Sequence, residues 1–123
     1  MKIAIPVIEN NGEKSRISEH FGHSPYFAFV ELKENKEFTF EILENPLENH
    51  SPGEIPDYML SKNVNLMVVR GIGDRAINAF DSLGIQVIRG ADGTLKEIIE
   101  KIIMNMLEDQ NYQVKQKYHE KDE

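Results

Sequence analysis

The segment Asn65-Leu66-Met67-Val68-Val69-Arg70-Gly71-Ile72-Gly73-Asp74 decides the fold, because it predicts a buried strand that turns tightly into a helix. The mainly apolar run 65–69 has the length and composition of a strand inside a sheet. A helix is predicted over 75–83, where Gly84 ends it as a C-cap. A further strand over 85–88 follows at once. This alternation of strand and helix predicts an α/β protein with βα units.

The last predicted helix has the most regular periodicity in the chain. Thr94 precedes it, and Glu97 lies three residues further on, which matches a capping box. The polar face of this helix is largely acidic, so it does not predict a helix lying on a membrane surface. The apolar residues recur at helical spacing and predict one stripe facing the core: Leu95, Ile98, Ile99, Ile102, Ile103, Met106 and Leu107.

The N-terminal half predicts three more strands. Residues 3–8 form an apolar run of strand length, and the runs 26–32 and 37–43 flank a short polar link. The two runs predict an antiparallel hairpin, whose second strand alternates apolar and polar residues. A short helix is predicted over 54–62, with Ile55, Met59 and Leu60 toward the core. The fold class is therefore α/β, with a mixed five-stranded sheet and about three helices.

The chain of 123 residues is long enough for one domain with a hydrophobic core. It contains no internal repeat and no linker that divides it. The domain is predicted to span residues 1–110, and the polar segment 111–123 is predicted to be a disordered tail.

The composition excludes several classes of function. The 21 acidic and 14 basic residues give a net charge of −7, which argues against a nucleic-acid partner. The chain has no cysteine, so disulfides, thiolate metal sites and cysteine nucleophiles are impossible. No apolar run approaches the roughly 20 residues that span a bilayer, and the start does not read as a signal peptide. The expected location is therefore cytoplasmic, with no membrane contact.

The segment Ile17-Ser18-Glu19-His20-Phe21-Gly22-His23-Ser24-Pro25, here called the histidine loop, is the first candidate site. Its turn-forming residues predict a loop between two strands, where binding residues are often carried. His20 and His23 are candidate metal ligands, and His50 in the polar loop 44–53 is a third. The alternative for all three is an ordinary solvated or hydrogen-bonded histidine.

The turn at Gly71 and Gly73 is the second candidate site. Glycines let the backbone approach a ligand closely, and a helix start favours negative charge. Arg70 or Arg75 would add a full positive charge, so an anion is the expected guest. The alternative is a tight turn that uses glycine for its geometry alone. The segment lacks the third glycine of a dinucleotide-binding fingerprint and the Gly-Lys pair of a phosphate-binding loop. No nucleophile and base are suitably paired, so an enzyme is not predicted.

Several segments together resemble a known family. They are residues 3–7, the histidine loop with Tyr26 and Phe27, the triplet 44–46, the turn 71–73, and residues 84–87 with Gly90. The chain resembles the dinitrogenase iron–molybdenum cofactor biosynthesis family, which includes NifX and the C-terminal part of NifB, over about residues 1–107. The resemblance implies a ribonuclease H-like fold without nuclease activity. It points to five residues of the site: His20, Phe21, Gly22, Gly71 and Gly73.

The resemblance also implies the function that we expect. This is non-catalytic binding or carriage of a metal–sulfur cluster, such as the iron–molybdenum cofactor, with a cluster donor or acceptor protein as partner. His20, His23 and His50 would ligate metal, while Gly71, Gly73 and Arg75 would hold the charge of the cluster. Two other functions stay open: a sensor of small anions or nucleotides that uses the turn 71–75, and a protein-interaction module. The expected state is a monomer or a weak homodimer.

Overall fold

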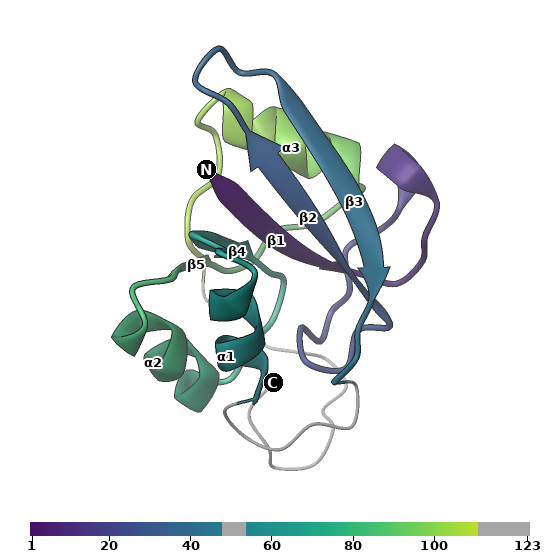
Figure 1. Cartoon of the computed structure of the whole chain (residues 1–123). Helices are drawn as coiled ribbons and strands as arrows, with labels where there is room; N and C mark the ends of the chain where they lie inside the picture. The colour runs from purple at the N-terminus through teal and green to yellow at the C-terminus, as the bar shows by residue number, and fades with distance from the viewer. Residues whose placement is uncertain (48–53, 111–123) are drawn as a thin grey trace.

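The computed structural model describes residues 1–47 and 54–110, and shows one mixed sheet with helices on both faces (Figure 1). The sheet contains five strands in the order β3-β2-β1-β4-β5. A short 3₁₀ helix, η1, follows the first strand. The elements in chain order are β1 (Lys2–Val7), η1 (Gly12–Lys14), β2 (Tyr26–Leu32), β3 (Phe38–Glu44), α1 (Glu54–Ser61), β4 (Leu66–Val68), α2 (Asp74–Ser82), β5 (Gln86–Ile88) and α3 (Leu95–Ile103).

The two halves of the sheet differ in strand direction. β1, β2 and β3 are antiparallel neighbours, whereas β4 lies parallel to β1 and β5 lies parallel to β4. The hairpin pairs Leu32 with Phe38 and Tyr26 with Glu44, which confirms the antiparallel pair expected from the sequence. The mixed sheet and the α/β class are thus confirmed. The likeness to ribonuclease H stays a prediction.

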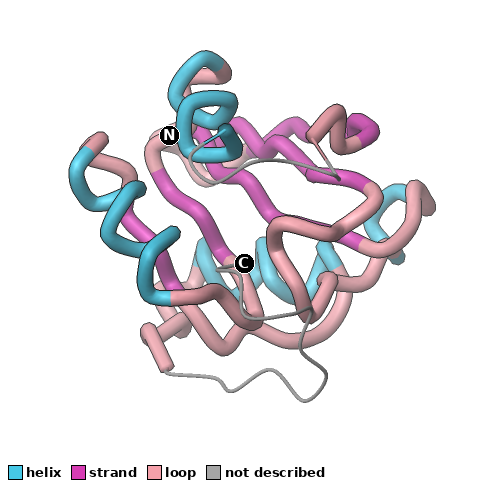
Figure 2. Tube along the Cα trace, turned by 90° about the horizontal axis from the view of Figure 1, so that it is seen from below, coloured by secondary structure: helices cyan, strands magenta, loops and turns pink. Residues whose placement is uncertain are grey.

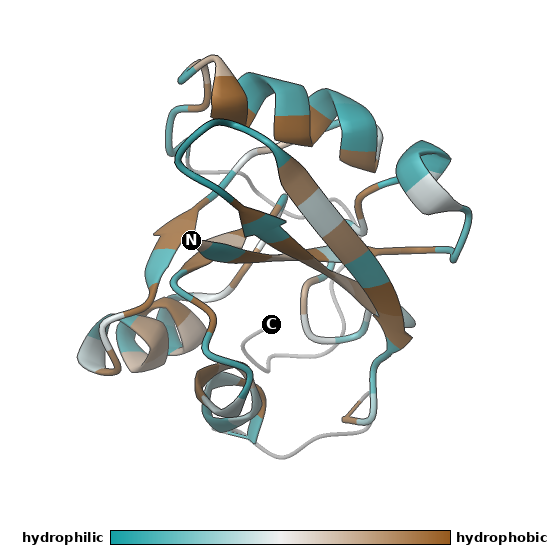
Figure 3. Ribbon diagram, turned by 45° about the horizontal axis from the view of Figure 1, so that its top comes forward, coloured by the Kyte–Doolittle hydropathy of each residue, from teal (hydrophilic) through white to brown (hydrophobic). Residues whose placement is uncertain are grey.

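The helices form two layers around the sheet. α3 lies over one face, and α1 and α2 lie over the other, as Figures 2 and 3 show. Alternate side chains of the central strands therefore serve two cores. In β1, Ile3 and Ile5 face the α3 side, whereas Ala4 faces the side of α1 and α2. Burial on both faces explains why this strand reads as a continuous apolar run.

The ends of the helices decide which apolar residues are buried. The expected capping box is present: Glu97 N donates to the Thr94 hydroxyl, and the Glu97 side chain accepts from Thr94 N. α3 ends at Ile103, and Asn105 then adopts a left-handed φ of 57°. The expectation that Met106 continues the buried stripe is therefore wrong, since this side chain is 60% exposed.

The short helix α1 also differs in one position from the expected pattern. Ile55 and Met59 are fully buried, as predicted, but Leu60 is 46% exposed. Four residues separate Ile55 from Met59, so the two share one face, and Leu60 is turned about 100° away from Met59. Among the described residues, none of the helices combines the length and hydropathy of a membrane-spanning segment.

The chain returns to the sheet after α3. Gln110 N donates to Arg89 O, and the Arg89 guanidinium forms two hydrogen bonds of 2.9 Å with the Asp109 carboxylate. These bonds hold residues 109 and 110 against the end of β5. The predicted tail, residues 111–123, lies outside the described residues.

Candidate functional site

The histidine loop lies between two strands that separate. β1 pairs with β4 only at Ile3 and Ala4. Further along β1, Ser18 N donates to Pro6 O at 2.8 Å, so the loop takes the place next to β1. On the other side, His20 forms an isolated parallel bridge with Gly71, just after β4. The loop therefore fills the space between the carboxyl ends of β1 and β4.

This position is the topological switch point of the sheet, where the connections on its two sides lead in opposite directions. The chain runs from β1 outward to β3 on one side and from β4 outward to β5 on the other. Ligands of open α/β sheets bind at the carboxyl ends of strands near such a point. The structure thus brings both candidate segments, the histidine loop and the turn at Gly71, to the edge where a ligand site is expected.

His20 is held at the rim of this edge. Its side chain is 12% exposed, and its Nε2 lies 4.0 Å from a carboxylate oxygen of Glu19. The hydroxyl of Ser18 donates to His20 O at 3.0 Å and fixes the backbone at this residue. His23, three residues further along, is partly exposed. Both histidines thus belong to one short loop, and the backbone of the first pairs with that of Gly71.

Phe21 is buried, whereas His20 and His23 are partly exposed. Its ring is 2% exposed and meets the ring of Phe80 in α2 edge to face, with centroids 5.8 Å apart. The Ser24 hydroxyl donates to Phe21 O at 3.1 Å and closes the turn that follows. Because its ring packs in the core, Phe21 joins the histidine loop to α2.

Asn45, at the end of β3, bonds to the same turn. Its side-chain amide donates to Gly22 O at 3.2 Å and to Ser24 O at 2.9 Å. Its side-chain oxygen accepts from Leu47 N at 2.8 Å, and the residue is 8% exposed. Although the sequence placed Asn45 in a family segment, it did not mark it as a site residue. Its partners are distant in sequence, so no local pattern indicates them.

The turn after β4 leads directly into α2. Gly71 is buried, and Gly73 is the N-cap of α2 with no side-chain hydrogen bond to the first turn. A helix start without a capping side chain presents backbone N–H groups and a partial positive charge. Gly71 is thus paired with His20 of the histidine loop, and Gly73 lies two residues further on, at the start of α2; their contact with a ligand stays a prediction.

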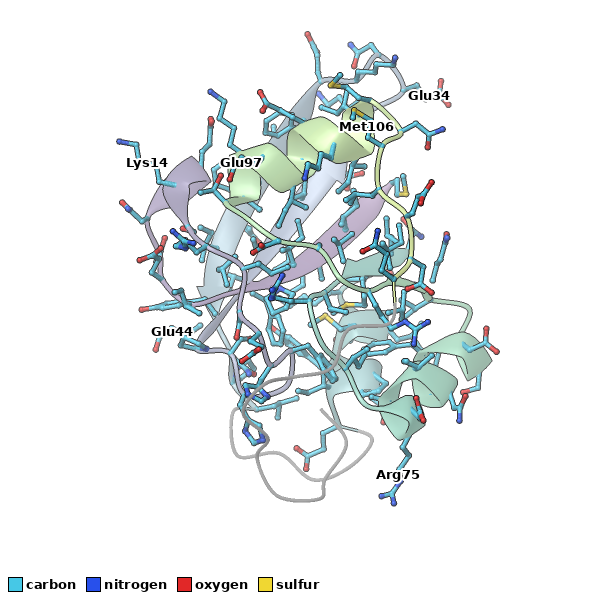
Figure 4. The ribbon with its side chains drawn as sticks, turned by 180° about the vertical axis from the view of Figure 1, so that it is seen from behind. Lys14, Glu34, Glu44, Arg75, Glu97 and Met106 are labelled. Atoms are coloured by element: carbon cyan, nitrogen blue, oxygen red, sulfur yellow. The ribbon has the colours of Figure 1, made fainter. Side chains whose placement is uncertain are left out.

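The side chains of the two arginines near this turn point in different directions. Arg70 points toward the next turn, where its Nη1 lies 3.4 Å from Ala91 O and 3.4 Å from an oxygen of Asp92. Arg75 is exposed in the first turn of α2 and projects outward from the body of the protein (Figure 4). Of the two, Arg75 is the one at the helix start, and its contact with a ligand stays a prediction.

The described residues do not form a complete metal site of their own. Within residues 1–47 and 54–110, no group of three or more His, Asp or Glu side chains is arranged to hold a metal ion. His50, the third candidate ligand, lies outside these ranges. An open hollow on the surface lies elsewhere, between η1 and the start of α3. Lys14, one of its lining residues, lies far from Arg75 in Figure 4. The lining of the hollow is polar: Asn11, Glu13, Lys14, Thr94 and Lys96.

Comparison with known proteins identifies the family. The sequence model of the dinitrogenase iron-molybdenum cofactor family matches residues 1–105. An uncharacterised protein of Methanocaldococcus jannaschii is 34% identical over 111 residues, which cover 88% of this chain and 90% of that protein.

Solved structures share the fold over nearly the whole length. The crystal structure of PH0822 has a TM-score of 0.80 and 35% identity, covering 89% of this chain and 96% of that one. The NMR structure of a NifB candidate from Thermotoga has a TM-score of 0.72 and 22% identity, covering 94% and 98% of the two chains, and supports the fold alone. The chain belongs to the dinitrogenase iron-molybdenum cofactor family.

Proposed function

We propose that this protein binds a metal–sulfur cluster at the edge formed by the histidine loop and the Gly71 turn, and carries it during cofactor assembly without catalysing a reaction. The observation that carries the proposal is the bridge between His20 and Gly71. It brings the backbone of His20 beside the segment that leads into the start of α2, which supports a site shared by the two. The family is that of the iron-molybdenum cofactor, which is such a cluster.

The chemistry of the two segments suits this cargo. Imidazole nitrogen is a ligand for iron, and the N–H groups of a helix start attract an anion. In a preformed cluster that carries its own terminal ligands, the sulfide bridges already occupy most coordination positions of the metals, so few positions are left for the protein to fill. The one or two imidazoles of the histidine loop are therefore sufficient as an attachment, with no third ligand from the described residues.

The net charge of −7 opposes an anionic ligand in general. Binding must then depend on local features: the start of α2, Arg75 and the imidazoles. A carrier also has to release its cargo, and few ligands at a partly exposed edge permit transfer to an acceptor protein. We infer that the partners are a cluster donor and a cluster acceptor, and that the protein works in the cytoplasm.

Titration under anaerobic conditions tests the proposal. A synthetic molybdenum–iron–sulfur cubane cluster with exchangeable terminal ligands is added to the protein, and visible absorption reports binding. We expect saturable binding by the wild type and at least tenfold weaker binding by the double variant His20→Ala, His23→Ala. An Asn10→Ala variant serves as a control, because Asn10 is an exposed residue outside the histidine loop. Equal affinity of the double variant would refute the role of the imidazoles.

A second function, binding of a small anion or nucleotide, is favoured by the uncapped start of α2. In this case the histidines are not needed, and the double histidine variant keeps its ligand. Thermal unfolding with phosphate, nucleotides and phosphorylated metabolites distinguishes the two functions, since a ligand of the folded state raises stability by RT ln(1 + [L]/Kd). Stabilisation at millimolar phosphate that survives both histidine substitutions would favour the anion sensor.

A further inference from the structure

We propose that Asn45 is a positioning residue of the cluster site. Its side chain holds the turn that carries His23 and follows His20, and so fixes the imidazoles relative to Gly71. The inference rests on the proposed function, because the cluster is the ligand that this turn presents. It adds the residue that directly follows β3 to a site that is otherwise built from the histidine loop and the turn after β4.

The hydrogen bonds of Asn45 show what it holds. The amide nitrogen donates to the carbonyls of Gly22 and Ser24, at 3.2 and 2.9 Å. These are the residues on either side of His23, so one amide group is hydrogen-bonded to the backbone before and after this histidine. The backbone N of Asn45 also donates to Pro25 O at 2.9 Å. The end of β3 is thereby joined to the last part of the histidine loop.

The amide group of Asn45 is fully used in this arrangement. Both donors go to the turn, and the side-chain oxygen accepts from Leu47 N at 2.8 Å. At 8% exposure, water cannot easily replace these partners. An aspartate here would turn a carboxylate oxygen toward two carbonyl oxygens, and an alanine would leave those carbonyls without their donor. Asparagine is thus the residue type that the site requires.

The consequence for binding is preorganisation. A loop that is already ordered loses little conformational freedom when it binds a ligand. With Phe21 O held by the Ser24 hydroxyl as well, successive carbonyls of the turn are bonded to side chains. We expect loss of the Asn45 amide to loosen the turn and to weaken cluster binding at least tenfold, although no ligand atom needs to touch Asn45.

The test compares variants of the full chain with two controls. Asn45→Ala and Asn45→Asp remove the donors. Asn65→Asp is the control for the amide-to-carboxylate change, because Asn65 uses its side-chain oxygen, which accepts from Lys2 N at 2.8 Å, and a carboxylate keeps that role. Ile99→Val is the control for lost stability, since Ile99 belongs to α3 and is buried in the core on the other face of the sheet.

Two readouts are measured on each variant. The first is the affinity for the synthetic molybdenum–iron–sulfur cubane, by anaerobic absorption titration. The second is amide hydrogen exchange of residues 21–24 without the cluster, by NMR. We expect both Asn45 variants to bind at least tenfold more weakly and to exchange faster at the turn, while Asn65→Asp and Ile99→Val match the wild type at the turn and in affinity. If Asn45→Ala does not fold, Ser24→Ala takes its place, because it removes another bond of the same turn.

The outcomes separate this inference from the proposed function. If the wild type binds the cubane and the Asn45 variants bind equally well, the positioning role is overturned and the proposed function stands. If Ile99→Val weakens binding as much as Asn45→Ala, the effect is one of general stability and the positioning role is again overturned. If the wild type does not bind the cubane at all, the proposed function fails and this inference fails with it.

Discussion

At the scale of single residues, Phe21 shows how a binding loop is attached to its scaffold. The ring lies in the core formed with α1 and α2, where it meets Phe80, while His20 on one side of it stays at the rim. Buried aromatic pairs in edge-to-face geometry contribute beyond the area that they bury. The position of the imidazoles therefore depends on a side chain that faces away from them.

Replacement of Phe21 by alanine is expected to destabilise the fold strongly. A large-to-small change at a fully buried aromatic position costs about 3–5 kcal/mol. Phe21→Leu keeps most of the volume and is expected to cost less than about 1.5 kcal/mol. Urea denaturation monitored by circular dichroism measures both. A loss below about 1 kcal/mol for Phe21→Ala would show that this ring does not contribute to the core as described.

The sequence allowed part of this site to be predicted. The neighbourhood of His20 and Gly71 follows from a general rule, since both segments come after strands whose carboxyl ends meet at one edge. The burial of Phe21 and the role of Asn45 could not be predicted from the sequence. The partners of Asn45 are 21 and 23 residues away, and only the pairing of β2 with β3 brings them together.

At the scale of elements, the ends of helices and strands depend on a few turn residues. Gly84 and Gly90 both have left-handed φ angles, 76° and 85°. Their surroundings differ: a Cβ at Gly84 meets nothing within 4 Å, whereas a Cβ at Gly90 lies 2.9 Å from the Cβ of Gln110 and 3.0 Å from its carbonyl oxygen. Gly90 thus allows the chain after α3 to approach the end of β5.

This difference predicts unequal effects of the same substitution. Gly84→Ala is expected to cost about 1 kcal/mol, for the left-handed backbone alone. Gly90→Ala has the same backbone strain and in addition forces Gln110 away, so its loss of stability is expected to exceed that of Gly84→Ala by about 1 kcal/mol. Urea midpoints of the two variants give the difference. Equal losses would mean that the contact with Gln110 contributes nothing to stability.

The start of α3 gives a second prediction at this scale. Thr94→Ala removes the acceptor for Glu97 N, and loss of such a cap costs about 1 kcal/mol. Thr94→Ser keeps the hydroxyl and is expected to remain close to the wild type in thermal unfolding. A Thr94→Ala variant as stable as Thr94→Ser would contradict the role of the cap. The capping box was readable in the sequence because both members lie within four residues.

The far end of α3 was harder to predict. The apolar spacing continues to Leu107, but the left-handed Asn105 ends the helical geometry before Met106. Periodicity identifies a helix and its buried face, whereas the last turn depends on local backbone angles. The exposure of Leu60 has a different cause, because this side chain lies on another face of α1 than the buried Ile55 and Met59.

At the scale of the whole molecule, the bond between Arg89 and Asp109 closes the fold. It joins the segment after α3 to the end of β5, across 20 residues of chain. The hydrogen bonds from the Arg89 side chain hold the pKa of the Asp109 carboxyl below its usual value. The ionised form of Asp109 is thus the one that the folded state stabilises.

The pH dependence follows from the direction of this shift. Because the pKa of Asp109 is lowered on folding, its contribution is complete above the usual aspartate range and is lost as the pH falls through the folded-state value. The pair is largely exposed to solvent, so we expect Asp109→Asn to cost about 0.5–1 kcal/mol at pH 7. The difference from the wild type should shrink toward zero near pH 2. A difference in urea unfolding that is the same at both pH values would contradict this.

The short contact between β1 and β4 has a consequence for engineering the protein. Only two residue pairs join these strands directly. Beyond Ala4, residues 17–20 lie between the two strands and pair with both sides. Trimming this segment, as one might shorten a surface loop, would leave β1 and the turn after β4 without their partners beyond Ala4, so that only the short direct pairing would join the two halves of the sheet. The segment that we propose to bind the cluster therefore also helps to hold the two halves of the sheet together.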